Sequence, residues 1–188
     1  MRVVRENHKI EEPAPSLSRV IDLLPFLSRF VRDPIDSMKA PLKLTWPAAL
    51  SLQAGAAMLS GALAGVLSRN FWDFLVGLVL FPLSSVIIGF IFSGFFYYFF
   101  IAFRSTYLDY RRLHSIVVVA TMPYFVLHAV SGFLAPIDLI GFALTSLLLI
   151  VGLIEQFNLD RIIVARLVGG MYAVFFVIWV ASLIHANF

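Results

Sequence analysis

Residues 74–103, FLVGLVLFPLSSVIIGFIFSGFFYYFFIAF, contain no Asp, Glu, Lys or Arg, and this stretch decides the fold class. A helix that crosses a bilayer needs about 20 mostly apolar residues, and this run is longer. Four further runs lack charged residues: 44–68, 113–137, 139–154 and 167–188. Over the 188 residues, 61% are hydrophobic and 13% are charged, whereas soluble domains average about 45–50% and about 25%. The sequence therefore predicts an all-α, polytopic membrane protein and excludes a water-soluble domain.

Five apolar stretches have the length of membrane spans. We place them at about 46–67, 75–103, 114–134, 137–156 and 163–184, which makes a five-helix transmembrane domain of residues 46–188. The second is the longest, with 29 residues, and Pro82 is expected to kink it. The fourth is short: the 16 uncharged residues 139–154 cover about 24 Å, so a flanking carboxylate, Asp138 or Glu155, is expected at an interface. Strands of a membrane barrel would alternate in polarity, and no such pattern is present.

Basic residues are distributed unevenly among the segments outside these spans. The N-terminal segment, the second loop and the fourth loop hold 13 of the 14 Lys and Arg residues, and the first loop holds only Arg69. Because cytoplasmic segments are enriched in Lys and Arg, we expect the N-terminus to be cytoplasmic and the C-terminus to lie on the other side. Residues 1–45 mix eight basic with six acidic residues, so no signal peptide is expected and the first span serves as the insertion signal.

The segment before the first span divides into two parts. Residues 1–15 are polar and are expected to be disordered. Residues 16–45 are expected to form a cytoplasmic amphipathic segment. One side of its helix is apolar and consists of Leu17, Val20, Ile21, Leu24, Leu27 and Val31. This helix either lies at the membrane interface or docks on the cytoplasmic end of the bundle. Asp33 and Pro34 then predict an N-cap and the first residue of a short second helix.

Small residues recur at four-residue intervals in three of the spans, which allows helix backbones to approach closely. We predict that these tracks pack inside the bundle, with a homo-oligomer seam or a substrate groove as the alternatives. The tracks are Ala57, Gly61 and Gly65 in the first span, Ser85, Gly89 and Ser93 in the second, and Ala165, Gly169 and Ala173 in the fifth.

Few polar residues are candidates for a functional role. Gln53, His128 and Glu155 are the plausibly embedded ones, although a structural role explains such residues more often: an amide that joins two helices, a hydrogen-bonded neutral His, and a Glu paired with Arg161 or Arg166. Arg111, Arg112 and Arg161 are candidates at the cytoplasmic face. The chain has no Cys and no motif of a metalloprotease, a serine hydrolase or a phosphate-binding loop. We therefore expect no catalytic, cofactor or metal site, and no nucleic-acid partner, because the basic residues form no stripe.

Over residues 30–188 the order of motifs resembles the Yip family of Ypt/Rab-interacting membrane proteins. The resemblance rests on Arg32-Asp33-Pro34, Trp46-Pro47, Arg104-Ser105-Thr106-Tyr107 with Arg111-Arg112, Ala120-Thr121-Met122-Pro123, Gly152-Leu153-Ile154-Glu155, and Asn158-Leu159-Asp160-Arg161 before Ala165. It implies five spans, a cytoplasmic N-terminus and no enzymatic activity. Eukaryotic members resemble organisers of early secretory traffic that bind small GTPases, whereas bacterial members have mostly no assigned function. The short cytoplasmic tail and the absence of Cys favour a bacterial member in the cytoplasmic (inner) membrane.

Two functional hypotheses follow. In the first, the protein organises the membrane or acts as a scaffold through its cytoplasmic face, with anionic lipid, a membrane protein or a second copy as partner. In the second, it is a channel or carrier for an ion or small solute, with proton coupling as one form, and it has a polar path near Gln53, His128 and Glu155. The second hypothesis requires these three side chains to converge on one hydrated cavity.

Overall fold

A computed structural model describes residues 23–40, 42, 44–131 and 137–186, with side chains up to Ala181. The expected disordered tail, residues 1–15, and residues 16–22 of the amphipathic segment lie outside the described residues. The regular elements of the described part are helices, including one π-helical turn, η2. In chain order they are α1 (Leu23–Arg32), α2 (Pro34–Lys39), α3 (Trp46–Leu67), α4 (Phe71–Leu75), η2 (Val76–Leu80), α5 (Phe81–Arg104), α6 (Tyr110–Ala120), α7 (Met122–His128), α8 (Ile137–Phe157) and α9 (Arg161–Ala186).

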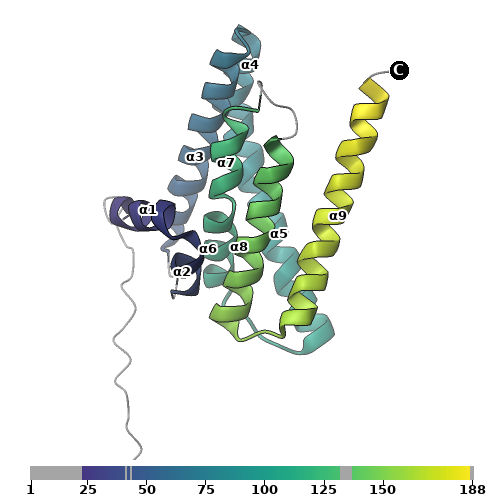
Figure 1. Cartoon of the computed structure of the whole chain (residues 1–188). Helices are drawn as coiled ribbons and strands as arrows, with labels where there is room; N and C mark the ends of the chain where they lie inside the picture. Colours follow the sequence, from purple (N-terminus) through teal and green to yellow (C-terminus); the bar gives the residue numbers. More distant parts are fainter. Residues whose placement is uncertain (1–22, 41, 43, 132–136, 187–188) are drawn as a thin grey trace, which may run out of the picture.

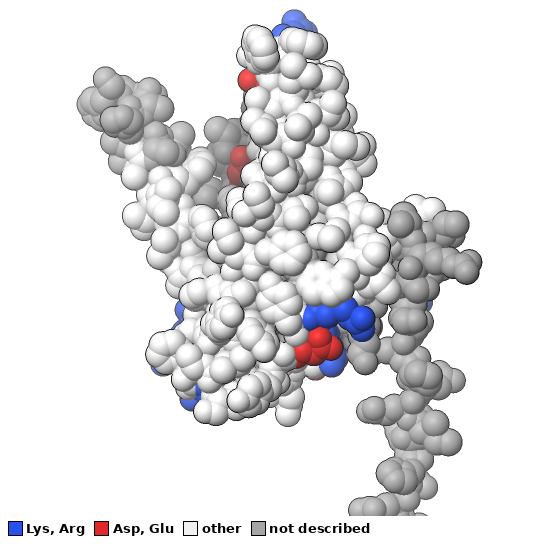
Figure 2. All heavy atoms as spheres, turned by 180° about the vertical axis from the view of Figure 1, so that it is seen from behind, with Lys and Arg blue, Asp and Glu red and all other residues white. Residues whose placement is uncertain are grey.

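Four helical stretches of the described chain are long and apolar enough to cross a membrane: Trp46–Leu67, Phe71–Arg104, Ile137–Phe157 and Arg161–Ala181. They run side by side along the length of the molecule (Figure 1). In the space-filling view, charged side chains lie toward the two ends of the visible face, and a broad uncharged band separates them (Figure 2). The prediction of an all-helical integral membrane protein is confirmed.

The third predicted span differs from the expected single helix over 114–134. Helix α6 begins four residues earlier, at Tyr110, and Thr121 separates it from the short helix α7. Pro123 causes this break because it has no N–H to donate to the carbonyl of residue 119 and its ring crowds the preceding turn. At the break, the Thr121 hydroxyl donates to the Val118 carbonyl at 2.8 Å. Neither piece alone has the length of a span.

The second predicted span begins earlier than expected and contains a widened turn before its proline. The continuous helical stretch runs over Phe71–Arg104. Within it, the Phe81 N–H bonds to the Val76 carbonyl, five residues back, in the π-helical turn. This turn lies directly before Pro82, which cannot donate a helical hydrogen bond. It also brings the backbone of Gly77 against α3: a Cβ on Gly61 would lie 2.3 Å from the Gly77 carbonyl oxygen.

The N-terminal helices lie beside the bundle. Figure 1 shows α1 across the bundle direction, close to the beginning of α3. The Asp33 carboxylate accepts from the Asp36 N–H at 3.1 Å and Pro34 is the first residue of α2, as the sequence indicated. On α1, Leu23 and Phe30 are buried, whereas Leu24 and Val31, from the predicted apolar side, are exposed. The apolar face of α1 is thus wider than the sequence prediction, because its buried edge is formed by Leu23 and Phe30.

Helix α6 is the centre of the bundle, because every residue from Leu113 to Ala120 is buried. It contacts α3, α5 and α8. By contrast, α9 contacts α8 and leans away from the other helices toward its C-terminal end (Figure 1). Its buried residues among those described are Val164 and Val168. The predicted packing track of α9, Ala165, Gly169 and Ala173, is exposed. The expectation that this track packs inside the bundle is therefore wrong within one chain: a shift of one residue rotates a helix face by about 100°, and the larger valines gain more contact with α8 than Ala or Gly would.

Candidate functional site

Gln53 lies in the contact between α3 and α5, with 1% of its surface exposed. Its Nε2 donates to the Ser85 carbonyl at 2.8 Å. A carbonyl only accepts hydrogen bonds, so the amide nitrogen must face Ser85 and Oε1 must be the oxygen that has no partner. Gly89 makes this approach possible, because a Cβ there would lie 2.3 Å from Nε2. The predicted track of Ser85, Gly89 and Ser93 is buried at this contact.

One turn further along α5, Ser93 connects to His114 of α6. The Ser93 hydroxyl donates to the Gly89 carbonyl at 2.7 Å and lies 2.9 Å from His114 Nδ1. Because the single hydroxyl proton points to Gly89, Nδ1 carries the proton between Ser93 and His114, and Nε2 is left without a partner. The imidazole is fully buried and stacks on Phe90 at 4.5 Å between ring centroids. Sequence reasoning missed this residue because it placed His114 at the end of a span; the Ser93 track opposite it was the available signal.

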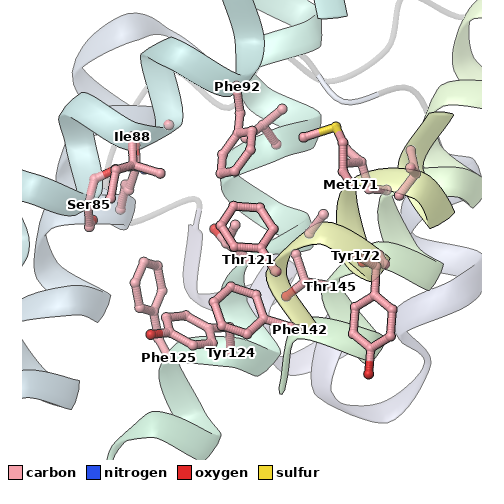
Figure 3. A pocket seen from close by; sticks show the side chains of 18 of the residues that line it. Ser85, Ile88, Phe92, Thr121, Tyr124, Phe125, Phe142, Thr145, Met171 and Tyr172 are labelled. Carbon is pink, nitrogen blue, oxygen red and sulfur yellow. The ribbon is translucent and has the colours of Figure 1, made fainter. Parts of the chain in front are cut away.

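A cavity of about 200 Å³ lies next to Gln53, among α5, α6, α7, α8 and α9. Aromatic rings form much of its wall, and Figure 3 shows Phe92, Tyr124, Phe125 and Phe142 around it. Tyr124 stacks on Phe142 at 4.5 Å, and Phe142 stacks on Phe175 of α9 at 5.6 Å. Its polar lining residues are Gln53, Ser84, Ser85, Thr121, Tyr124, Thr145, Ser146 and Tyr172. Among the described residues that line it, none is acidic, basic or a histidine.

The other two embedded candidates lie away from this cavity. His128 Nδ1 is 3.1 Å from an Asp138 oxygen in the first turn of α8, and both side chains are about one quarter exposed. Glu155 is 42% exposed and lies 3.9 Å from Arg161, near the other end of α8. Neither residue lines the cavity. Gln53, His128 and Glu155 therefore do not converge. His128 is next to Asp138 at one end of α8, and Glu155 is next to Arg161 at the other end.

Gln156, which sequence reasoning passed over, joins the N-terminal segment to the bundle. It is 7% exposed, and its Nε2 donates to the Met38 carbonyl at 2.8 Å. Its Oε1 accepts from the Leu42 N–H and from Arg112 Nε, both at 3.1 Å. The side-chain amide of Gln156 thus connects α8 with α2, with the segment that follows α2, and with α6. The sequence gives no sign that Gln156 is buried, because Gln is usually exposed and this one follows the charged Glu155 at a helix end.

The cationic candidates lie around this end of the molecule. Arg111 and Arg161 are exposed, and the guanidinium of Arg112 lies 5.4 Å from the centre of the Phe157 ring. On α2, the hydrogen bond from Lys39 and its positive charge lower the pKa of the Asp36 carboxyl.

Two further observations concern metal binding and the similarity of the chain to known proteins. Within the part of the chain that the structure describes, no group of three or more His, Asp or Glu side chains is placed to hold a metal ion. Comparisons of the chain with protein-family models, with curated proteins and with solved structures give no match.

Proposed function

We propose that the protein is a non-enzymatic, multi-pass membrane protein of the Yip type, with a membrane-organising or scaffold role that it performs through its cytoplasmic face. The observation that carries this proposal is the placement of α1. One side of the helix, with Leu23 and Phe30, packs on the protein, and the other side exposes Leu24 by 69% and Val31 by 81%. Arg29 and Arg32 lie in the last turn of the same helix. A helix with an exposed apolar face and arginines on its polar face is typical of one that lies at an anionic lipid surface.

The proposal includes five spans and a cytoplasmic N-terminus. Residues 110–128, which contain α6 and α7, cover about 28 Å at 1.5 Å per residue, close to the thickness of a bilayer core. The pair therefore serves as the fifth span beside the four long apolar helices. The end with α1, α2 and the α5–α6 and α8–α9 turns has most of the basic residues of the described chain, which supports a cytoplasmic location for this end. The membrane that we propose is a bacterial inner membrane.

Gln156 supports the same role because it fixes the orientation of the N-terminal segment. Its three hydrogen bonds hold Met38 and Leu42 against α8 and Arg112. Helix α1 contacts α2 and is oriented by it. A helix that is held in one orientation can present its lipid-facing side, or a partner-binding side, without a loss of conformational entropy on binding.

The absence of Cys from the sequence allows a direct test with a single introduced thiol. In vesicles that contain anionic phosphatidylglycerol, we expect a water-soluble maleimide to label Val31→Cys about tenfold more slowly than in pure phosphatidylcholine vesicles. Each arginine near an anionic surface contributes about 1 kcal/mol to binding, and two of them suffice for such a difference. Tyr107→Cys, in the exposed α5–α6 turn, serves as the control and should be labelled at the same rate in both.

Replacement of both arginines, Arg29→Gln and Arg32→Gln, in the Val31→Cys background should remove the difference between the two kinds of vesicle. Equal labelling of Val31→Cys in both kinds of vesicle would contradict a lipid-binding cytoplasmic face. Each purified variant must have the same helical circular dichroism spectrum as the unaltered chain.

A further inference from the structure

A groove lies between α5 and α9 on the outer surface of the bundle. Arg166, an exposed residue in the second turn of α9, lines one part of it. The other described residues that line the groove are apolar, and Ile91 and Phe95 of α5 and Val174 of α9 are among them. Gly170 adds no side chain to the wall, and nothing lies within 4 Å of a Cβ built there. The bundle is therefore hollowed on a side that faces the bilayer.

The groove continues inward into the cavity of about 200 Å³ described above. Phe92, Met171 and Phe175 line both spaces, and the rings of Phe92 and Phe175 are 5.8 Å apart between centroids. Figure 3 shows Phe92 and Met171 on the same side of the cavity. Ile88 and Phe175, which line the cavity, are 49% and 37% exposed. The cavity thus opens outward between α5 and α9, where α9 leans away from the bundle (Figure 1).

The walls of both spaces suit a hydrocarbon chain. Among the described residues that line them, only Arg166 carries a charge. An apolar cavity of about 150 Å³ holds a benzene-sized molecule, so about 200 Å³ holds a short length of chain. The bilayer around the protein supplies such chains at high concentration. A lipid acyl chain is therefore the occupant that the walls favour.

Arg166 provides a place for the head group of that lipid. Side chains of a helix tilt toward its N-terminus, which for α9 is the end of the molecule with the α8–α9 turn and most of the basic residues of the described chain. A long Arg side chain near the end of a span extends toward the interface. None of the ion pairs of the described chain includes Arg166. An exposed cation without an acidic partner, at the edge of an apolar groove, is complementary in charge to a lipid phosphate.

The spacing along α9 fits one lipid molecule. Met171 and Phe175 lie five and nine residues after Arg166, which is about 8 and about 14 Å further along the helix at 1.5 Å per residue. The hydrocarbon core of a bilayer is about 30 Å thick, so an acyl chain of one leaflet covers about 15 Å of depth. A lipid whose phosphate contacts Arg166 can therefore extend one chain along the groove as far as the opening of the cavity.

We propose that this site binds an anionic phospholipid. The phosphate contacts Arg166, and one acyl chain lies in the groove and enters the cavity past Phe92, Met171 and Phe175. A lipid with a net negative charge binds better than phosphatidylcholine, because the choline group cancels the charge that attracts an arginine. The site is separate from α1 and requires only that the chain is embedded in a membrane, so it does not rest on the function proposed above.

The full chain in phosphatidylcholine nanodiscs provides the test. The probe is a phosphatidylglycerol that carries a diazirine near the end of one acyl chain, added at increasing mole fraction. We expect saturable photolabelling of peptides that line the cavity, including the segment around Phe142 of α8. The matching phosphatidylcholine probe should label these peptides about fivefold less, since one arginine contributes about 1 kcal/mol to the binding of an anionic lipid.

Arg166→Gln should remove the difference between the two probes, because Gln keeps a polar side chain but has no charge. Arg161→Gln is the matched control. Arg161 is an exposed residue of the same helix, but it does not line the groove. This variant should keep the preference for phosphatidylglycerol.

Ser146→Phe tests the path of the acyl chain. Ser146 of α8 lines the cavity and is half-buried, so a phenyl ring there occupies part of the space and labelling of the cavity peptides should be lost. Leu147→Phe places the same ring at the next residue, which is 59% exposed and does not line the cavity. Labelling of this control should equal that of the unaltered chain. Each variant must retain the helical circular dichroism spectrum.

Three results would overturn the proposal: labelling confined to outward faces of the helices, equal labelling by the two probes, or a preference for phosphatidylglycerol that persists in Arg166→Gln. The labelled peptides identify the site, so a lipid bound at α1 does not count as support. A failure of the α1 test leaves these outcomes unchanged.

Discussion

Gly61→Ala is expected to destabilise the protein by about 1–2 kcal/mol, although the same change normally stabilises a helix. The new Cβ would lie 2.3 Å from the Gly77 carbonyl oxygen and 2.7 Å from its Cα. These are backbone atoms, which cannot turn aside as a flexible side chain would, so α3 and the π-helical turn must separate. Overpacking of this kind typically costs about 1–3 kcal/mol, and it outweighs the gain of about 0.5–1 kcal/mol from replacing a helical Gly.

Gly55→Ala in the same helix is the matched control, because nothing lies within 4 Å of a Cβ there. It should leave stability unchanged or raise it by up to about 1 kcal/mol. Both variants can be compared by unfolding in mixed micelles of increasing dodecyl sulfate content, followed by circular dichroism. A Gly61→Ala variant as stable as the unaltered chain would show that α3 and the π-helical turn do not meet at their backbones.

Gln156→Leu is expected to release α2 from the bundle. The substitution leaves the Met38 carbonyl, the Leu42 N–H and Arg112 Nε without their common partner. Leaving a buried polar group unpaired costs about 1–3 kcal/mol, so the loss should total about 2–4 kcal/mol, reduced where water can reach the separated groups. Hydrogen exchange should therefore accelerate at the amides of α2 and of Leu42, while exchange in α3 and α8 should change little.

Gln156→Glu separates the contribution of the amide N–H group from that of the amide oxygen. A carboxylate keeps the acceptor for Leu42 and Arg112 but has no N–H for the Met38 carbonyl, so we expect exchange rates in α2 between those of the unaltered chain and Gln156→Leu. Exchange in α2 that is the same in all three proteins would contradict the role assigned to Gln156.

Much of the helix layout was predictable from hydropathy. Charge-free runs located α3 to the residue and α8 to within one residue, because long apolar segments between polar turns leave little choice of boundary in a membrane. The Asp33-Pro34 start of α2 was predictable for a local reason, since an N-cap and a proline act within one turn. The third span was misjudged because a proline can either kink a helix or end it, and which of these Pro123 does depends on how the chain around Thr121 packs against its neighbours.

The candidate site was less predictable. The sequence singled out Gln53, but not that its amide bonds to the Ser85 backbone, nor that His114 and Gln156 are fully or nearly fully buried. The small-residue track of α9 had the same spacing as the two tracks that are buried, and yet Val164 and Val168 are the buried residues of α9 among those described. Spacing defines which residues share a helix face, but not which face meets a neighbour.

Hydropathy along the chain was enough to identify a helical, membrane-embedded protein and to place the ends of its long helices approximately, because these properties depend on the transfer of local segments into lipid. Only the tertiary structure decided which helix faces meet, that Gln156 joins the N-terminal segment to α8, and that Gln53 and Ser85 share a cavity. Those contacts join residues far apart in the chain, and side-chain shape and hydrogen-bond geometry between helices select them.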